Sequence, residues 1–104
     1  MREGDLMRQI LVALSEDGHF AYRCNVGRFK MADGRWFDTG LPPGFSDIAG
    51  FRAGDARAFY LEVKTPTGRA TPQQLAFIAA MQKRGALAGV VRSVEEARAL
   101  VSVV

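Results

Sequence analysis

A strand–helix–strand unit between residues 58 and 92 constrains the fold more than any other part of the chain. Its centre, TPQQLAFIAAMQKRG, predicts a helix with Thr71 as N-cap and Gln74 completing a Thr-x-x-Gln capping box. Pro72 suits the first helical position and Gly85 the end of the helix. The flanking segments, AFYLEVK and ALAGVVR, are typical of strands. A connection of this length allows the two strands to run parallel, so we expect a sheet with helices packed on it.

The other periodicities predict one more helix and several short strands before this unit. An apolar stripe spaced i, i+4, i+7, i+8 predicts a helix over 4–17, and HFAYRCNV and FSDIAGF have strand character. RFKM and RWFDT flank an Asp-Gly turn that favours a hairpin. SVEEARALVSVV predicts a final helix that opens with a second capping box, from Ser93 to Glu96. The prediction is one α/β (α+β) domain over residues 1–104, of order αβββαβα, with a mixed sheet of four or five strands.

Composition excludes several classes of protein. The chain is 48% hydrophobic and 24% charged, as in ordinary globular domains, and no apolar run approaches the length of a membrane span. The first ten residues contain no apolar core of a secretory signal, so we expect none. One cysteine, Cys24, and one histidine, His19, exclude a structural zinc site, and a lone cysteine fits a reducing compartment.

The segment YLEVKTP places Glu62 and Lys64 on the same face of a predicted strand whose other face is apolar. Glu-x-Lys alone is a weak signal, because both residue types are common and a solvated ion pair explains it. Asp47 strengthens the signal, since a short turn over 52–57 would fold its otherwise apolar segment back alongside this strand. Two carboxylates held close together repel each other unless a cation lies between them.

The chemistry that these residue types support is phosphodiester hydrolysis. Two carboxylates, Asp47 and Glu62, with a backbone carbonyl such as that of Val63, form an all-oxygen site that suits Mg²⁺ or Mn²⁺. Such an ion polarises a phosphoryl oxygen and lowers the pKa of water. The ammonium group of Lys64 could then orient the water or stabilise charge at the phosphorus.

The run GFSDIAG, followed by FYLEVKTPTGRATPQQLAFIAAMQKRGALAGVVRSVEEA, resembles the VRR-Nuc family, a branch of the PD-(D/E)xK nuclease superfamily. The resemblance covers residues 44–97 densely and extends more loosely to the N-terminal helix and to YRCNVG, which is similar to the family's Arg-x-Asn-x-Gly stretch. One departure is Ser46, where the family usually has Pro before the Asp. The resemblance implies a restriction-endonuclease-like core and metal-dependent DNA cleavage, with junction resolution as one form of it.

The resemblance also implies roles for individual residues. Asp47 and Glu62 match the metal-binding acids, and Lys64 matches the catalytic lysine. Gln74 matches a helix glutamine of this branch, although its place in a capping box explains it equally well. Glu3 is a further candidate metal ligand, but it also suits the dipole at the N-terminus of the first helix.

DNA contacts are expected from residues near loops and ends of elements. The net charge of +3 and the pI of about 9.5 are compatible with a polyanionic partner. Arg69, in the loop after the Glu-x-Lys strand, is a candidate phosphate contact or a solvated turn residue. Asn25, between Arg23 and Arg28, either satisfies backbone groups of its own loop or contacts DNA along with these two arginines.

The expected assembly is a homodimer or higher homo-oligomer, because one small subunit covers little of a duplex and cutting two strands needs two active sites. The partner is duplex or branched DNA, and the expected location is the cytoplasm of a bacterial or phage-infected cell. Two alternatives remain open at this point. One is a non-catalytic DNA-binding module on a nuclease fold, and the other is a protein-interaction domain in which the basic residues are incidental.

Overall fold

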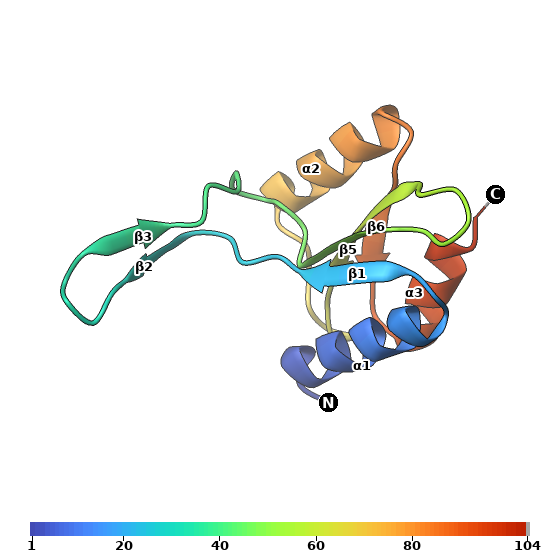
Figure 1. Ribbon diagram of the computed structural model, residues 1–104, viewed down its shortest axis with the longest axis horizontal. Coiled ribbons are helices and arrows are strands. Elements are labelled where there is room, and N and C mark those ends of the chain that lie inside the picture. The colour runs from blue at the N-terminus through green and yellow to red at the C-terminus, as the bar shows by residue number, and fades with distance from the viewer. Residues whose placement is uncertain (104) are drawn as a thin grey trace.

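A four-stranded mixed sheet carries helices on both faces, and a two-stranded hairpin projects away from it (Figure 1). This is a computed structural model that describes residues 1–103. No helix in that range is both long and apolar enough to cross a membrane. In chain order the elements are α1 (Glu3–Glu16), β1 (Phe20–Arg23), β2 (Arg28–Lys30), β3 (Trp36–Asp38), β4 (Ile48–Phe51), β5 (Ala58–Val63), α2 (Pro72–Lys83), β6 (Leu87–Val91) and α3 (Val94–Val101).

The topology of the sheet confirms the predicted fold class. The strand order is β1-β4-β5-β6, with β1–β4 and β4–β5 antiparallel and β5–β6 parallel. The parallel pair is joined by α2, as the strand–helix–strand unit predicted. Without the hairpin, the order of elements is αβββαβα. The hairpin predicted from the Asp-Gly turn is present, but β2 and β3 pair only with each other and form a sheet of their own.

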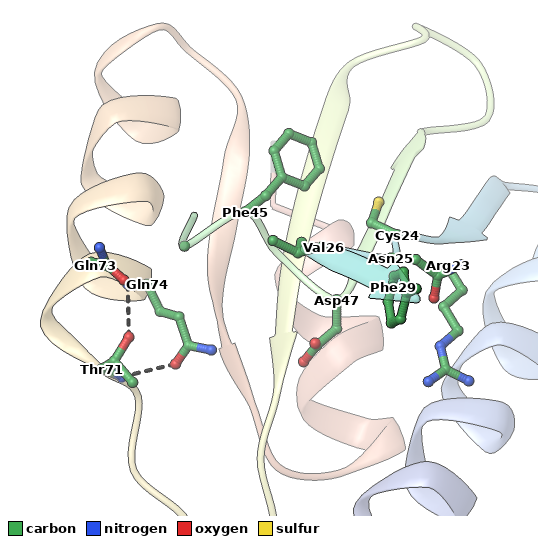
Figure 2. Close-up of a pocket in the computed structure, with 11 residues that line it drawn as sticks. Arg23, Cys24, Asn25, Val26, Phe29, Phe45, Asp47, Thr71, Gln73 and Gln74 are labelled. Atoms are coloured by element: carbon green, nitrogen blue, oxygen red, sulfur yellow. Dashed lines mark hydrogen bonds between the residues drawn. The ribbon is translucent and has the colours of Figure 1, made fainter. Parts of the chain in front are cut away.

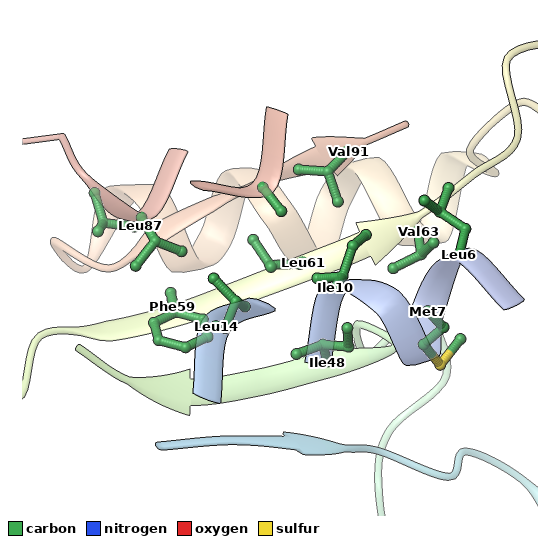
Figure 3. Packing of buried hydrophobic residues seen from close by; sticks show 12 residues of the cluster. Leu6, Met7, Ile10, Leu14, Ile48, Phe59, Leu61, Val63, Leu87 and Val91 are labelled. Atoms are coloured by element: carbon green, nitrogen blue, oxygen red, sulfur yellow. The ribbon is translucent and has the colours of Figure 1, made fainter. Parts of the chain in front are cut away.

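The main core lies between the sheet and the pair of helices α1 and α3 (Figure 3). The apolar stripe of α1 packs on the apolar face of β5, whose Phe59, Leu61 and Val63 are fully buried. Burying such side chains stabilises the fold by about 1.5–3 kcal/mol each. Because successive side chains of a strand point to opposite faces, this packing directs Glu62 to the other face, toward α2.

A smaller aromatic cluster fixes α2 on that other face. The ring of Phe77 from α2 lies 5.5 Å from Tyr60 of β5 and 4.6 Å from Phe45, measured between centroids. Gly44 lets the chain pass close to α2, because it has a φ of 87° and a Cβ there would lie 2.6 Å from the carbonyl oxygen of Gln73. The segment that leads to Asp47 is therefore held against the first turn of α2.

The helix caps follow the sequence prediction with one difference. The Thr71–Gln74 capping box is complete, with both reciprocal hydrogen bonds formed. In α3, the Ser93 hydroxyl accepts from the backbone N–H of Glu96 at 3.1 Å, as predicted. The Glu96 carboxylate, however, accepts from the backbone N–H of Arg92 at 3.0 Å, so only half of the second box forms.

The hairpin, here called the arm (residues 27–39), lies outside the core. Its base is closed by a hydrogen bond from the N–H of Thr39 to the carbonyl of Gly27, at 3.1 Å. All six residues of β2 and β3 are exposed. The projecting arm gives the molecule extents of 46 × 31 × 27 Å and a radius of gyration of 14.1 Å, against about 13 Å for a compact domain of this length (Figure 1).

Candidate active site

Asp47 lies one residue before β4, not inside the strand as the sequence analysis expected. Its carbonyl accepts the N–H of Cys24 at 2.7 Å, and its carboxylate Oδ2 accepts the N–H of Val63 at 2.9 Å. The neighbouring Ser46 hydroxyl is buried and donates to the carbonyl of Ile48 at 2.9 Å. Ser46 thus braces the bend at the place where the family usually has Pro. These bonds tie the Asp47 carboxylate to the end of β5.

Glu62 is the one carboxylate among the buried residues of the described chain, with 1% of its surface exposed. Its Oε1 accepts a hydrogen bond of 2.8 Å from Gln74 Nε2 and lies 3.7 Å from Lys64 Nζ. Its Oε2 is buried and has no hydrogen-bond partner within residues 1–103. A buried polar atom without a partner is costly and unusual, so this oxygen indicates a missing ligand.

The environment of Glu62 raises its pKa to about 8. Burial is the largest cause, because it disfavours the charged form. The Asp47 carboxylate raises the pKa further, because two negative charges held close together repel each other. The Lys64 ammonium lowers it, and the charge of Glu3 raises it slightly. A cation between Asp47 and Glu62 would offset the repulsion between the two carboxylates and lower the pKa of Glu62.

Gln74 has both of the roles that the sequence left open. Its side-chain oxygen accepts the N–H of Thr71 at 2.8 Å and completes the cap of α2. Its side-chain nitrogen donates to Glu62. The capping box therefore holds the amide in the orientation that Glu62 requires, and one side chain joins the helix end to the buried acid.

The donor set fits a hard divalent ion. Mg²⁺ is commonly held by one or two carboxylates and keeps several waters, so Asp47, Glu62 and the Val63 carbonyl form a suitable set. Within the described range, no three His, Cys, Asp or Glu side chains come together as a metal-binding group. Glu3 is half-buried at the start of α1 and acts on Glu62 through its charge, but it does not complete such a group.

A cavity of about 490 Å³ opens beside the site, between the base of the arm and α2 (Figure 2). Asp47 and Gln74 line it from the side of the acids, and Arg23 and Asn25 line it from the end of β1. Cys24 also lines it, and burial together with the charge of Asp47 raises the pKa of its thiol. The thiol is therefore protonated, which argues against Cys24 as a nucleophile.

The other two predicted DNA contacts lie elsewhere. Arg28 is on the arm, where its guanidinium stacks over Trp36 at 5.3 Å from the ring centroid. Arg69 is exposed in the loop between β5 and α2. The structure therefore brings Arg23 and Asn25 to the cavity beside Asp47, but it does not bring Arg28 or Arg69 there.

Arg92 is a structural contributor that the sequence analysis did not single out for the site. It directly follows β6, and its guanidinium donates to the carbonyls of Thr65 and Gly68, at 2.5 and 2.6 Å. It thereby holds the turn that follows Lys64. The sequence feature that could have identified Arg92 was the expected parallel pairing of β5 and β6, which places the ends of the two strands side by side. The hydrogen bond from Lys64 N to the Val91 carbonyl shows this arrangement.

A mixed sheet that places an Asp before one strand and Glu-x-Lys on the next has the features of PD-(D/E)xK nuclease domains. The family described as the VRR-NUC domain matches residues 1–95 of the chain. The chain belongs to the VRR-NUC domain family, a family of nuclease domains, which confirms the resemblance found in the sequence.

Solved structures agree with this assignment. A structure titled "VRR_NUC domain" has a TM-score of 0.67 and 21% identity and covers 95% of this chain and 92% of its own. A second, titled "VRR_NUC domain protein", has a TM-score of 0.70 and 17% identity and covers 97% of this chain and 85% of its own. At these identities the likeness establishes the fold. No curated protein matches the chain.

Proposed function

We propose that this protein is a divalent-metal-dependent endonuclease that hydrolyses phosphodiester bonds of DNA. The observation that carries the proposal is the buried, unpartnered Oε2 of Glu62, in a carboxyl group beside that of Asp47. A buried acid whose pKa is raised this far, first by burial and then by a neighbouring carboxylate, is typical of a functional site and not of a solvated ion pair. The buried position also argues against the interpretation of Glu62 and Lys64 as surface charges.

Asp47, Glu62 and the Val63 carbonyl would hold Mg²⁺ or Mn²⁺. When bound, the ion supplies electrostatic stabilisation of the negative charge on the phosphate and makes a water molecule more acidic. Gln74 keeps Glu62 in place by its hydrogen bond of 2.8 Å. The Val63 N–H does the same for Asp47 through its bond of 2.9 Å to Oδ2. Both acids are therefore oriented before the ion and the substrate arrive.

Lys64 is the group that acts on the reacting phosphate. Its ammonium is largely buried and lies 3.7 Å from Glu62 Oε1. From this position it can donate a hydrogen bond to an attacking water or to a phosphate oxygen, where negative charge develops. Its positive charge is desolvated, so each such interaction is stronger than it would be in water.

The DNA partner is held mainly through its backbone. Arg23 and Asn25 line the cavity beside Asp47. Arg28 on the arm and Arg69 in the loop after β5 are exposed and would add phosphate contacts outside that cavity. Contacts of this kind make affinity fall steeply with salt and carry little sequence information. Cutting two strands, or a four-way junction, requires two such sites, so the working form is a homodimer or higher homo-oligomer in the cytoplasm of its host cell.

The experiment that tests this function is a cleavage assay with Mg²⁺ or Mn²⁺ on linear, nicked, flap and four-way DNA. The wild type should cut at least one of them, and K64A should lose cleavage while still binding DNA. K83A, which removes a lysine from the exposed end of α2, serves as the matched control and should cut like the wild type. DNA binding without turnover on any substrate with either metal would favour a non-catalytic DNA-binding module instead.

A further inference from the structure

The cavity beside Asp47 has walls that the proposed chemistry leaves unused. Its volume of about 490 Å³ lies within the range of about 300–1,000 Å³ that is typical of pockets for small organic ligands. Asp47 and Gln74 belong to the acid site, and Arg23 is a candidate phosphate contact. Several of the side chains that remain are aromatic or carry an amide, namely Phe29, Phe45 and Gln73 (Figure 2).

One face of the arm is turned toward this cavity. Phe29 of β2 lies opposite Phe37 of β3, so the two rings share one face of the ladder, whereas Trp36 lies on the other face. Phe29 lines the cavity, and Phe37 lines a neighbouring hollow of about 400 Å³. Arg23 and Asn25, at the end of β1, line both. The arm therefore adds aromatic rings to a basic part of the surface.

The aromatic walls of the cavity suit the face of a nucleobase. The ring of Phe29 is 50% exposed, so it keeps a surface on which another ring can stack. Phe45 is held from behind by Phe77, with 4.6 Å between ring centroids, which makes its wall of the cavity firm. Basic grooves with exposed aromatic rings are the means by which proteins hold single-stranded nucleic acids, because every base has a face that can stack.

Two side-chain amides line the same cavity from different elements. Asn25 follows β1, and Gln73 lies in the first turn of α2. None of the hydrogen bonds drawn in Figure 2 involves either of these amides, whereas the amide of Gln74 bonds Thr71. A side-chain amide has a donor and an acceptor, as the edges of the bases do. The two amides can therefore bond the edge of a base whose face lies on Phe29.

We propose that this cavity binds the base of one unpaired nucleotide next to the scissile phosphate, with Phe29 stacked on the base and Asn25 and Gln73 bonded to its edge. The cavity opens directly beside Asp47, so a phosphate held at the acid site places its neighbouring nucleotide there. A paired base would first have to leave its stack, which costs least where the nucleotide is already unpaired. Because DNA is the ligand, this site rests on the proposed function and narrows its substrate to DNA with an unpaired nucleotide at the cut.

The test is the affinity of the protein for a fluorescently labelled duplex that carries a single-stranded flap, measured by anisotropy in EDTA. One abasic nucleotide is moved along the flap and across the branch point, which removes a base and keeps the backbone. With the abasic nucleotide at one position beside the branch, the wild type should bind about tenfold more weakly, because a stack on an aromatic ring is lost. At the other positions the loss should be less than about twofold, because those bases make no stack with the protein.

Variants of the cavity make the test specific. F29A should bind the intact flap about tenfold more weakly and show no further loss with the abasic nucleotide, because both changes remove the same contact. W36A removes a ring that is 60% exposed on the other face of the arm, and it should keep both the affinity and the abasic penalty. Q73A should weaken binding of the intact flap but not of the abasic one, whereas Q9A, which removes an exposed amide from α1, should change neither.

The outcomes separate this site from the nuclease activity. Equal affinity for intact and abasic DNA at every position, no binding in EDTA, an F29A protein that keeps the whole abasic penalty, or an equal loss for W36A would overturn the proposal. An abasic penalty in a protein that cuts no DNA with either metal would support the base site and refute the endonuclease. Cleavage without an abasic penalty would refute the base site and leave the endonuclease standing.

Discussion

The end of β5 and the arm differ in how their short strands are held in place. β5 is fixed by a core on one face and by α2 on the other, and its pairing with β4 and β6 leaves Glu62 almost no freedom. β2 and β3 are held by their own ladder and a turn, and every one of their residues is exposed. The acid of the candidate site thus lies where burial is highest, whereas the arm, which the core does not hold, leaves its large apolar side chains exposed.

The largest expected effect is on DNA cleavage, which should depend on an acid near the end of β5 and not on an acid of the arm. D47N removes one of the two paired carboxylate charges, and we expect cleavage to fall by about 10³-fold because stabilisation of the transition state depends on that charge. D33N makes the same change on the arm, where the carboxylate pairs only with Arg35, and should change cleavage by less than about twofold. Initial rates on a plasmid substrate measure both. Equal losses would mean that the acids of the two regions do not differ in function.

The second prediction is that a truncation in β5 lowers the free energy of unfolding much more than a truncation on the arm. L61A leaves a cavity under β5 and should lower the free energy of unfolding by about 2–5 kcal/mol. W36A removes a larger but 60% exposed side chain and should cost less than about 0.5 kcal/mol in the monomer. Urea denaturation at low protein concentration, where dimers dissociate, gives both values. A large loss for W36A under these conditions would show that the arm packs on its own core.

The third prediction concerns the raised pKa of Glu62. Its folded-state pKa of about 8 exceeds the unfolded value, so the stability that the protonated acid contributes is present below about pH 4.5 and is lost as pH rises through about 8. E62Q keeps a neutral side chain and avoids this loss. In EDTA it should therefore gain on the wild type by at most about 1.4 kcal/mol per pH unit between pH 4.5 and 8, and no further above pH 8.

Thermal unfolding across this pH range is the measurement for E62Q. Added Mg²⁺ at pH 8 should reverse the order, since it stabilises the wild type by binding and leaves E62Q unchanged. If the two proteins kept a constant difference in melting temperature from pH 4.5 to 8.5, Glu62 would not titrate in this range.

The smallest expected effect tests the support beneath Lys64. R92A removes the guanidinium that holds the carbonyls of Thr65 and Gly68, so the turn after Lys64 should loosen. We expect kcat to fall about tenfold with little change in KM, because misplacement of a catalytic group costs rate. R84A, whose guanidinium bonds the Ala80 carbonyl at the end of α2, is the control and should keep its kcat. A rise in KM with an unchanged kcat would instead assign Arg92 to substrate binding.

Much of the fold follows from local pattern. The period-two alternation of AFYLEVK separates Leu61 and Val63 from Glu62 and Lys64, and the capping box sets the start of α2 at Thr71. These features are decided by neighbours in the sequence, so the sequence predicts them. The strand–helix–strand unit then predicts the parallel pair β5–β6 from length alone.

The features of the fold and of the site that the sequence did not predict depend on contacts between residues far apart in the sequence. The dual role of Gln74 needs the distance from α2 to β5, and the role of Arg92 needs the turn at residues 65–68, which lies 24 and 27 positions away in the sequence. The position of the Asp47 carboxylate depends on its hydrogen bond from the N–H of Val63, 16 positions away, which no local pattern indicates. The alternation of apolar and polar residues likewise does not predict that the arm is separate from the main sheet. A hairpin has the same alternation whether or not it pairs with another sheet.

The most direct test of the central claim is an anomalous difference map from crystals soaked in Mn²⁺. The account predicts one strong peak between the Asp47 carboxylate, Glu62 Oε2 and the Val63 carbonyl, and its loss in crystals of E62Q. A map with saturating Mn²⁺ and no peak between the two acids, or one in which Glu62 Oε2 faces away from the ion, would contradict it.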